Sequence, residues 1–250
     1  MKESKHKADK GLIFRETFNS EQEVRRNGGE PSNVTFENGK CEFSGSLDSY
    51  IGYGIIPIQN IAEASNVTFR LKFSVSDLTS HQEILNIGSG WLTGIILRID
   101  STGQFRFHVG DADLTTDVGA LEVDTEYDIV CTYDGSFLKT YIDGSLVKSQ
   151  EHLITTLVVE NLLVGVRSTP YAGTIELIEI YNYAWSAEEV ENAYNKSRFR
   201  DYIPPTDKKV ILDVNAFGGS VVNKLAGDVY GDNLIGDSKF EDNGWWSITQ

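Results

Sequence analysis

The chain has 250 residues, which is long enough for one large β or α/β domain or for two small ones. Hydrophobic residues make up 40% of it and charged residues 24%, a globular balance that argues against wholesale disorder. With 37 acidic against 22 basic residues the net charge is −15. That balance excludes the clustered cations of a nucleic-acid surface and disfavours anionic lipid.

The first ten residues carry four Lys and no apolar stretch, so we expect a flexible arm and no classical signal peptide. No run of eighteen apolar residues occurs, and we therefore predict no membrane partner and no membrane-spanning helix. The two cysteines, Cys41 and Cys131, lie in separate strand-like segments. We expect both to be buried free thiols rather than a disulfide.

Between residue 11 and about residue 181 the sequence alternates between apolar and polar residues, which predicts strands with one buried and one wet face. In residues 67–75 the apolar positions are Val67, Phe69, Leu71, Phe73 and Val75, and the polar positions are Thr68, Arg70, Lys72 and Ser74. Residues 105–109 repeat the pattern with Arg106 and His108 outward, and residues 127–133 repeat it again. His108 is interpreted as a surface residue.

Turn signals separate these strands at short intervals. Asn38-Gly39, Asp134-Gly135 and Asp143-Gly144 accept the positive φ of hairpin turns, and Thr102-Gly103 marks another break. Strands that recur about every ten residues with short connections favour an antiparallel sandwich. No strand–helix–strand alternation appears, which argues against a parallel sheet.

One helix is predicted near the end of this region. Ser186 to Glu189 reads Ser-Ala-Glu-Glu, a capping box, while Trp185 and Val190 fit a hydrophobic staple. We expect the helix to run to about Lys196. Residues 201–250 then read as a linker and tail, stiffened at Pro204-Pro205.

Several segments together resemble the concanavalin A-like lectin/glucanase superfamily in its laminin-G-like branch. The segments are residues 43–53 (FSGSLDSYIGY), Tyr133-Asp-Gly with residues 141–144 (YIDG), and residues 173–182 (GTIELIEIYN) with 185–190 (WSAEEV). Trp185 stands where that family usually has Leu. The resemblance covers roughly residues 11–197 and implies an all-β, two-sheet antiparallel jelly roll at residues 11–200, followed by one short helix.

The tail carries a fainter resemblance. Residues 233–246 (NLIGDSKFEDNGWW) are similar to the opening of a second carbohydrate-binding β-sandwich. Modular chains of this kind are similar to bacteriophage tail, fibre or head-decoration proteins, which implies location in a virion or at an extracellular surface. That implication is an analogy of architecture.

We predict no catalytic residues. The glucanase branch places its acids on one strand, and the nearest stretch here is Glu176-Leu-Ile-Glu179. Its spacing of three puts the two carboxylates on opposite faces of a strand, so we interpret them as edge charges. No histidine, serine or phosphate-loop motif of an enzyme appears.

Metal binding stays open at the sequence level. Asp111, Asp113 and Asp117 lie in an acidic loop whose oxygens suit Ca²⁺, but Thr116 stands where a calcium loop needs Gly. The alternative is a solvated hairpin loop. We predict no obligatory cofactor.

Sugar binding would need aromatic rings that face solvent. Trp91 and Tyr171 lie in loop-like segments and are the first candidates, followed by Tyr50 and Tyr53. Aromatic residues in strands are more often core than platform.

Three functions fit the sequence. The first is a non-catalytic recognition or adhesion module, which would bind a glycan within a virion or surface assembly. The second is a purely structural assembly or decoration protein, which would pack against other virion or surface proteins. Its termini would dock to a partner or hold a homo-oligomer such as a trimer. The third and least favoured is a glycoside hydrolase or lyase.

Overall fold

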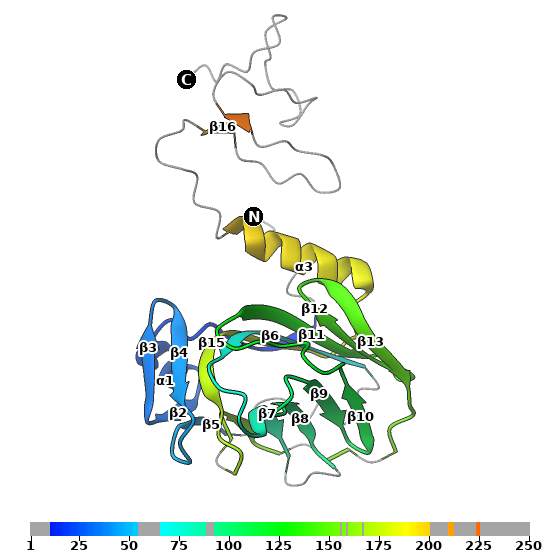
Figure 1. Ribbon diagram of the computed structural model, residues 1–250, viewed down its shortest axis with the longest axis horizontal. Helices are drawn as coiled ribbons and strands as arrows, with labels where there is room; N and C mark the ends of the chain where they lie inside the picture. Colours follow the sequence, from blue (N-terminus) through cyan, green and yellow to red (C-terminus); the bar gives the residue numbers. More distant parts are fainter. Residues whose placement is uncertain are drawn as a thin grey trace, which may run out of the picture. The chain divides into compact units, whose positions relative to one another are not determined.

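The computed structural model describes residues 11–54, 66–88, 93–155, 157–158, 160–166, 168–200, 210–212 and 224–225. The chain divides into two compact units, Met1–Asn192 and Ala193–Gln250. The first unit holds two antiparallel sheets packed face to face, with sheet A above sheet B in Figure 1. The predicted all-β jelly-roll sandwich is therefore confirmed.

Sheet A is eight-stranded, in the order β13-β12-β11-β6-β15-β4-β3 with β1 paired to β15. Its strands are β1 (Leu12–Glu16), β3 (Val34–Glu37), β4 (Lys40–Ser44), β6 (Val67–Val75), β11 (Glu126–Tyr133), β12 (Phe137–Ile142), β13 (Ser145–Glu151) and β15 (Ala172–Tyr181). Sheet B is seven-stranded, in the order β10-β9-β8-β7-β14-β5-β2. Its strands are β2 (Gly29–Ser32), β5 (Tyr50–Tyr53), β7 (Gln82–Ile87), β8 (Ile95–Ile99), β9 (Phe105–Val109), β10 (Ala112–Thr115) and β14 (Leu162–Val164).

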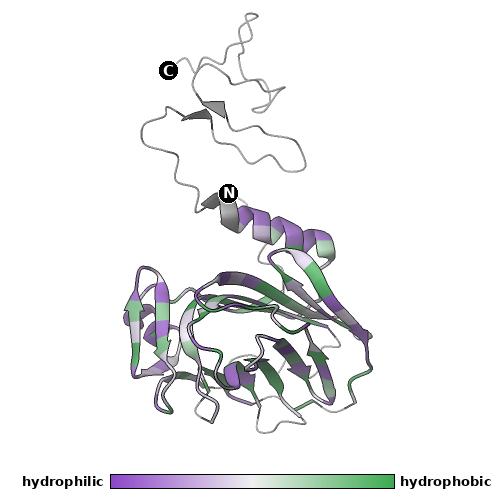
Figure 2. Cartoon of the chain, viewed as in Figure 1, coloured by the Kyte–Doolittle hydropathy of each residue, from purple (hydrophilic) through white to green (hydrophobic). Residues whose placement is uncertain are grey.

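The core lies between the two sheets, as the alternation predicts. Polar and apolar colours alternate along the strands in Figure 2. Aromatic rings of β6 and β9 join the sheets, with ring centroids of Phe69 and Phe107 6.1 Å apart and those of Phe73 and Phe105 6.3 Å apart. Contacts of this kind between inner faces hold a sandwich together. Cys41 and Cys131 are buried free thiols there, as predicted, and burial raises the pKa of both.

The predicted turns are confirmed. Asn38 and Gly39, with φ of 53° and 75°, join β3 to β4 as a two-residue hairpin. Asp143 and Gly144, with φ of 50° and 79°, join β12 to β13 in the same way. Positive φ at both central residues matches the right-handed twist of the flanking strands.

The described part of the first unit also includes two helices. The helix α1 (Glu21–Arg26) is capped by Ser20, and α3 (Ala187–Arg200) begins in the first unit and extends into the second. The predicted capping box is present, because the Glu189 amide donates to Ser186 Oγ at 3.2 Å and the Ser186 amide donates to Glu189 Oε2 at 2.8 Å. The helix runs four residues beyond the predicted end at Lys196.

Residues 182–192, here called the closing segment, cross the outer face of sheet A. Trp185 packs on Tyr181 with ring centroids 4.7 Å apart, and its amide donates to Thr68 Oγ1 at 2.9 Å. Thr68 Oγ1 in turn donates to the Tyr183 carbonyl at 2.7 Å. Thr68 is therefore buried. Arg70 is buried as well, beside Asp128 and Glu179, and the prediction of a wet outer face is wrong at these two positions.

The second unit contains the antiparallel pair β16 (Val210–Leu212) and β17 (Lys224–Leu225). Most of the predicted tail, and the whole predicted arm at residues 1–10, lie outside the described residues. Among the residues that the structure does describe, no helix is long and apolar enough to cross a membrane.

Candidate functional site

Strand register gathers a group of polar side chains on the outer face of sheet B. In the ladder from β7 to β9, Glu83 pairs with Arg98 and Arg98 pairs with Arg106. The inward neighbours, such as Leu97 and Phe107, belong to the core, so these polar residues point outward. The same alternation places other members on this face, here called the sheet B face: Tyr50, Glu83, Asn86, Arg98, Arg106, His108 and Asp113.

Hydrogen bonding on the sheet B face is incomplete. Asn86 donates to Glu83 Oε2 at 3.1 Å, a normal bond. Arg106 reaches Asp113 Oδ2 only at 3.4 Å and Asp100 Oδ2 only at 3.7 Å. The Arg106 Nε and Asp113 Oδ1 atoms are buried, and neither has a hydrogen-bond partner within the described part of the chain. The rest of both side chains is partly exposed, to 26% for Arg106 and 36% for Asp113, so a polar ligand can reach their outer polar atoms.

The Asp100 carboxylate contributes little to Arg106, because its own turn uses it. Asp100 Oδ1 accepts from the Thr102 hydroxyl at 2.6 Å, from the Thr102 amide at 2.9 Å and from the Gln104 amide at 3.1 Å. Burial raises the pKa of Asp100, but these hydrogen bonds and the charge of Arg106 lower it overall. Asp100 is thus an ionised turn cap, and it faces Arg106 only at long range.

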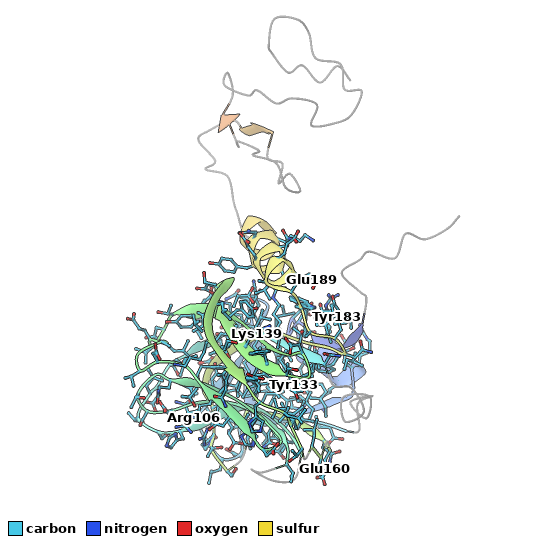
Figure 3. The ribbon with its side chains drawn as sticks, turned by 90° about the vertical axis from the view of Figure 1, so that its right-hand side faces the viewer. Arg106, Tyr133, Lys139, Glu160, Tyr183 and Glu189 are labelled. Carbon is cyan, nitrogen blue, oxygen red and sulfur yellow. The ribbon has the colours of Figure 1, made fainter. Side chains whose placement is uncertain are left out.

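The two arginines of the sheet B face repel one another. The pKa of Arg98 is lowered, first by burial and then by the positive charge of Arg106. Attraction to Asp113, Glu83 and Asp100 acts in the opposite direction but does not compensate. In Figure 3 the labelled Arg106 lies far from Tyr183 and Glu189, the residues that mark the closing segment.

The three acidic candidates for calcium binding each have a different partner. Asp111 accepts from the hydroxyl and the amide of Thr155 at 2.6 and 3.0 Å, and these bonds lower its pKa to about 2. Asp113 faces Arg106, and Asp117 pairs with Lys148 at 3.0 Å. In the described ranges no group of three or more His, Cys, Asp or Glu residues is placed to hold a metal ion. Calcium binding by Asp111, Asp113 or Asp117 stays a prediction.

The structure describes three of the four aromatic candidates, and two of these are core residues. Tyr171 is fully buried between Phe43 and Phe73, and its hydroxyl donates to the Ser74 carbonyl at 2.6 Å. The fold therefore uses Tyr171 as a core residue, and burial raises its pKa far above the usual value.

Tyr53 is also buried, and its hydroxyl donates to Glu16 Oε2 at 3.1 Å. Neither of these two rings offers a face to a sugar. Tyr50 is half-buried and shares the outer side of sheet B with Arg98 and Arg106. Trp91 lies outside the described residues. Of the four candidates, Tyr50 alone is placed by the structure on the sheet B face.

His108 also differs from its prediction as a surface residue, because it is 3% exposed. It lies on β9 between β8 and β10, with Ile96 and Asp113 as its cross-strand neighbours.

The carboxylates of Glu176 and Glu179 lie on the same face of β15, contrary to the prediction. A β-bulge between Ile175 and Leu177 shifts the register, so that both carboxylates meet cations of β6. Glu176 pairs with Lys72 at 3.1 Å, while Glu179 pairs with Arg15 at 2.7 Å and with Arg70 at 3.4 Å. The interpretation as edge charges is wrong, because β15 lies inside sheet A and Glu179 is buried. That they have no catalytic role is still a prediction.

The alternation predicts Arg106 as an outward residue, but neither Arg106 nor Arg98 is among the predicted site residues. A usable signal was present. The predicted break at Thr102 marks the turn between β8 and β9. A hairpin centred on that residue places residues 98 and 106 opposite each other, as the structure shows. Glu83 and Asn86 could not be found in this way, because a bulge between Glu83 and Leu85 interrupts the alternation of β7.

Comparison with known proteins extends these findings. The family model described as the concanavalin A-like lectin/glucanases superfamily matches residues 38–191. A comparison with curated proteins gave no match.

Solved structures share the fold at low sequence identity. The botulinum neurotoxin serotype D binding domain has a TM-score of 0.63 and 18% identity, over 80% of this chain and 53% of that one. The botulinum neurotoxin type G receptor binding domain has a TM-score of 0.60 and 15% identity, over 75% and 51%. Trypanosoma rangeli sialidase has a TM-score of 0.59 and 14% identity, over 75% and 33%. The chain thus spans about half of the toxin domains and a third of the sialidase.

Proposed function

The chain belongs to the concanavalin A-like lectin/glucanases superfamily, and on that premise we propose that it is a non-catalytic recognition module that binds glycans on the sheet B face. One observation carries the proposal. The partly exposed Arg106 guanidinium and Asp113 carboxylate lie side by side on this face, and their own contact is long, at 3.4 Å. Sugar hydroxyl groups donate and accept hydrogen bonds at once, so one ligand can bind both side chains.

Two further features support a sugar ligand. Asn86 lies on the same face and has a planar amide that can both donate and accept. Tyr50, on β5, supplies an aromatic ring three strands from β8, which is roughly 14 Å at the usual strand spacing. An aromatic face at one end and hydrogen-bonding groups at the other suit an extended ligand more than a compact one.

The structural neighbours fit this proposal without deciding it. Two of them are receptor-binding domains of botulinum neurotoxins, and a receptor-binding role is the kind of function proposed here. Sialidases also occur among the neighbours, so turnover has to be tested as well as binding. The proposal of no catalysis is supported by the ion pairs of Glu176 and Glu179.

The test is binding of the whole chain to an array of immobilised glycans. We expect the wild-type protein to bind a subset of glycans, and the combined variant Asn86→Ala and Arg106→Ala to lose that binding. Lys139→Ala is the matched control, because Lys139 pairs with Asp134 on sheet A. Binding by the double variant at wild-type strength, or no binding by the wild type, would overturn the proposal.

Two additional arms address the remaining predictions. Arrays run with calcium and with EDTA test whether Asp111, Asp113 and Asp117 contribute through a metal. Incubation of the bound glycans, and of β-glucan, alginate and a fluorogenic sialoside, tests for turnover. Release of product that Glu176→Gln abolishes would show an enzyme and would contradict the non-catalytic role.

A second candidate function, a structural assembly protein, has one observation in its favour. Leu146 and Val147 lie on the edge strand β13 and are 54% and 40% exposed. Leu153, two residues after this strand, is 71% exposed. Apolar side chains on an edge strand favour contact with another chain. Light scattering tests this function, since a stable trimer or larger assembly that Val147→Glu dissociates would support it and a monomer would oppose it.

The proposed context is a virion or another surface assembly. Its support is the modular order of the sequence, in which residues 233–246 are similar to the start of a second carbohydrate-binding module. Detection of the protein in purified particles by mass spectrometry tests the context. Its absence from every particle and surface fraction would oppose it.

A further inference from the structure

Arg98 and Arg106 stand directly opposite each other on β8 and β9, on the outer side of the sheet. Like charges at directly opposite positions of an antiparallel pair destabilise it. Burial and the charge of Arg106 lower the pKa of Arg98, which means that keeping both arginines protonated costs free energy. An arrangement that breaks a local rule in this way is expected at a functional site.

The neighbouring carboxylates leave part of the hydrogen-bonding capacity of the Arg106 guanidinium unused. Its contacts with Asp113 and Asp100, at 3.4 and 3.7 Å, are longer than the usual 2.7–3.2 Å of an N–H···O bond. Its buried Nε atom has no partner among the described residues. A planar oxyanion can accept two parallel bonds from one guanidinium, which a lone hydroxyl cannot.

We propose that the glycan bound on the sheet B face carries a carboxylate, which Arg106 binds in a bidentate manner with Arg98 as its second positive neighbour. This inference rests on the proposed function. The partly exposed Asp113 carboxylate then accepts a hydrogen bond from a hydroxyl group of the same sugar. A carboxylate with nearby hydroxyl groups, such as an acidic sugar offers, thus suits both side chains.

The net charge of −15 opposes any anionic ligand at long range. That repulsion is screened over about 8 Å at physiological ionic strength, whereas the guanidinium acts at contact. Charge-assisted hydrogen bonds are about twice as strong as neutral ones, so the local interaction dominates once the ligand is bound. Association, however, should be slow compared with that of a basic protein.

The experiment compares each carboxylate-bearing glycan with its own methyl ester on one array, beside neutral and sulfated glycans. The ester keeps the ring and its hydroxyl groups but removes the charge. We expect esterification to weaken wild-type binding about 10- to 100-fold, and Arg106→Gln to weaken binding of the free acid by a similar factor. Arg106→Lys, which keeps the charge but loses the planar fork, should fall between wild type and Arg106→Gln.

The outcomes separate this inference from the function on which it rests. If neutral glycans and esters bind as well as free acids, and Asn86→Ala weakens that binding, the carboxylate inference fails and glycan recognition stands. Binding of sulfated glycans alone also overturns the carboxylate. If no glycan binds, both proposals fall. Lys139→Gln on sheet A, with circular dichroism of every variant, controls for charge loss and for folding.

Discussion

The outer faces of the two sheets carry arginines in opposite circumstances. On sheet A, Arg70 donates to both carboxylate oxygens of Asp128, at 3.0 and 2.6 Å, and contacts Glu179 at 3.4 Å. Burial lowers the pKa of Arg70, but the hydrogen bonds and charges of Asp128 and Glu179 raise it overall. On sheet B, Arg98 faces another arginine, and its pKa is lowered.

The difference shows that one sequence pattern produces two kinds of surface. Both arginines are outward residues of an alternating strand, but Arg70 binds two acids, whereas Arg98 has an acid, Glu83, on one side and a second arginine on the other. On sheet A the partner is an acid and the closing segment covers the strand beside it, so the charge belongs to the fold. On sheet B, Arg98 lies between Glu83 and Arg106, and the Arg106 side chain is still 26% exposed, so a ligand can reach it.

The largest expected effect is on sheet A. Arg70→Met should lower the free energy of unfolding by about 3 to 5 kcal/mol, because Asp128 would remain buried without its cation. Urea denaturation measures the change. Arg25→Met is the control, since Arg25 and Glu21 form an exposed pair and its loss should cost at most about 0.5 kcal/mol. Equal stability of the two variants would refute a structural role for the ion pairs of Arg70 with Asp128 and Glu179.

Loosening the closing segment should have a somewhat smaller effect on the free energy of unfolding. Trp185→Ala deletes the ring that packs on Tyr181 and should cost about 3 kcal/mol. Ser186→Ala removes the adjacent helix cap but keeps the ring, and should cost about 1 kcal/mol. Thermal unfolding ranks the two variants, and the reverse order would show that the helix cap, not the ring, holds the closing segment.

The hydrogen bonds between Asp111 and Thr155 should break only at strongly acidic pH, when the Asp111 carboxylate becomes protonated. The pKa of Asp111 is lowered from 3.8 to about 2, first by the Thr155 hydroxyl and then by the Thr155 amide. Any stabilisation from this contact is therefore present above pH 3.8 and is lost as the pH falls toward 2. An NMR titration of the Thr155 amide shift should have its midpoint near 2. A midpoint at 3.8 would mean that the contact does not form.

The smallest expected effect on stability is at the sheet B face. Arg106→Gln removes one of two opposed like charges, so the free energy of unfolding should change by less than about 0.5 kcal/mol or should rise. Denaturation in urea under the conditions used for Arg70→Met gives the comparison. A loss of 2 kcal/mol or more would place Arg106 in the structural framework and remove the contrast between the sheets.

The sequence predicted much of the fold because its signals are local. Alternation in residues 67–75, hairpin dipeptides such as Asn38-Gly39 and the box at Ser186 and Glu189 each depend on neighbouring residues. The errors arose where distant segments meet. Nothing near Thr68 shows that residues 182–192 will cover it.

The site was less predictable for the same reason. Tyr171 reads as a loop residue, yet it reaches the core through contacts with Phe43 and Phe73, which lie far from it in sequence. The bulge near Glu176 is also invisible to simple spacing. Only the opposition of Arg98 and Arg106 could have been derived, by centring the hairpin between them.

The most direct test of the account is a map of where a bound glycan lies. NMR spectra of the labelled chain, titrated with a glycan that the array selects, report which amides and arginine Nε–H groups shift. We predict shifts on β7, β8, β9 and β10, including the Nε–H of Arg106, and unchanged signals around Arg70. Shifts that cluster around Arg70 and the closing segment, with the β8–β9 hairpin unaffected, would contradict it.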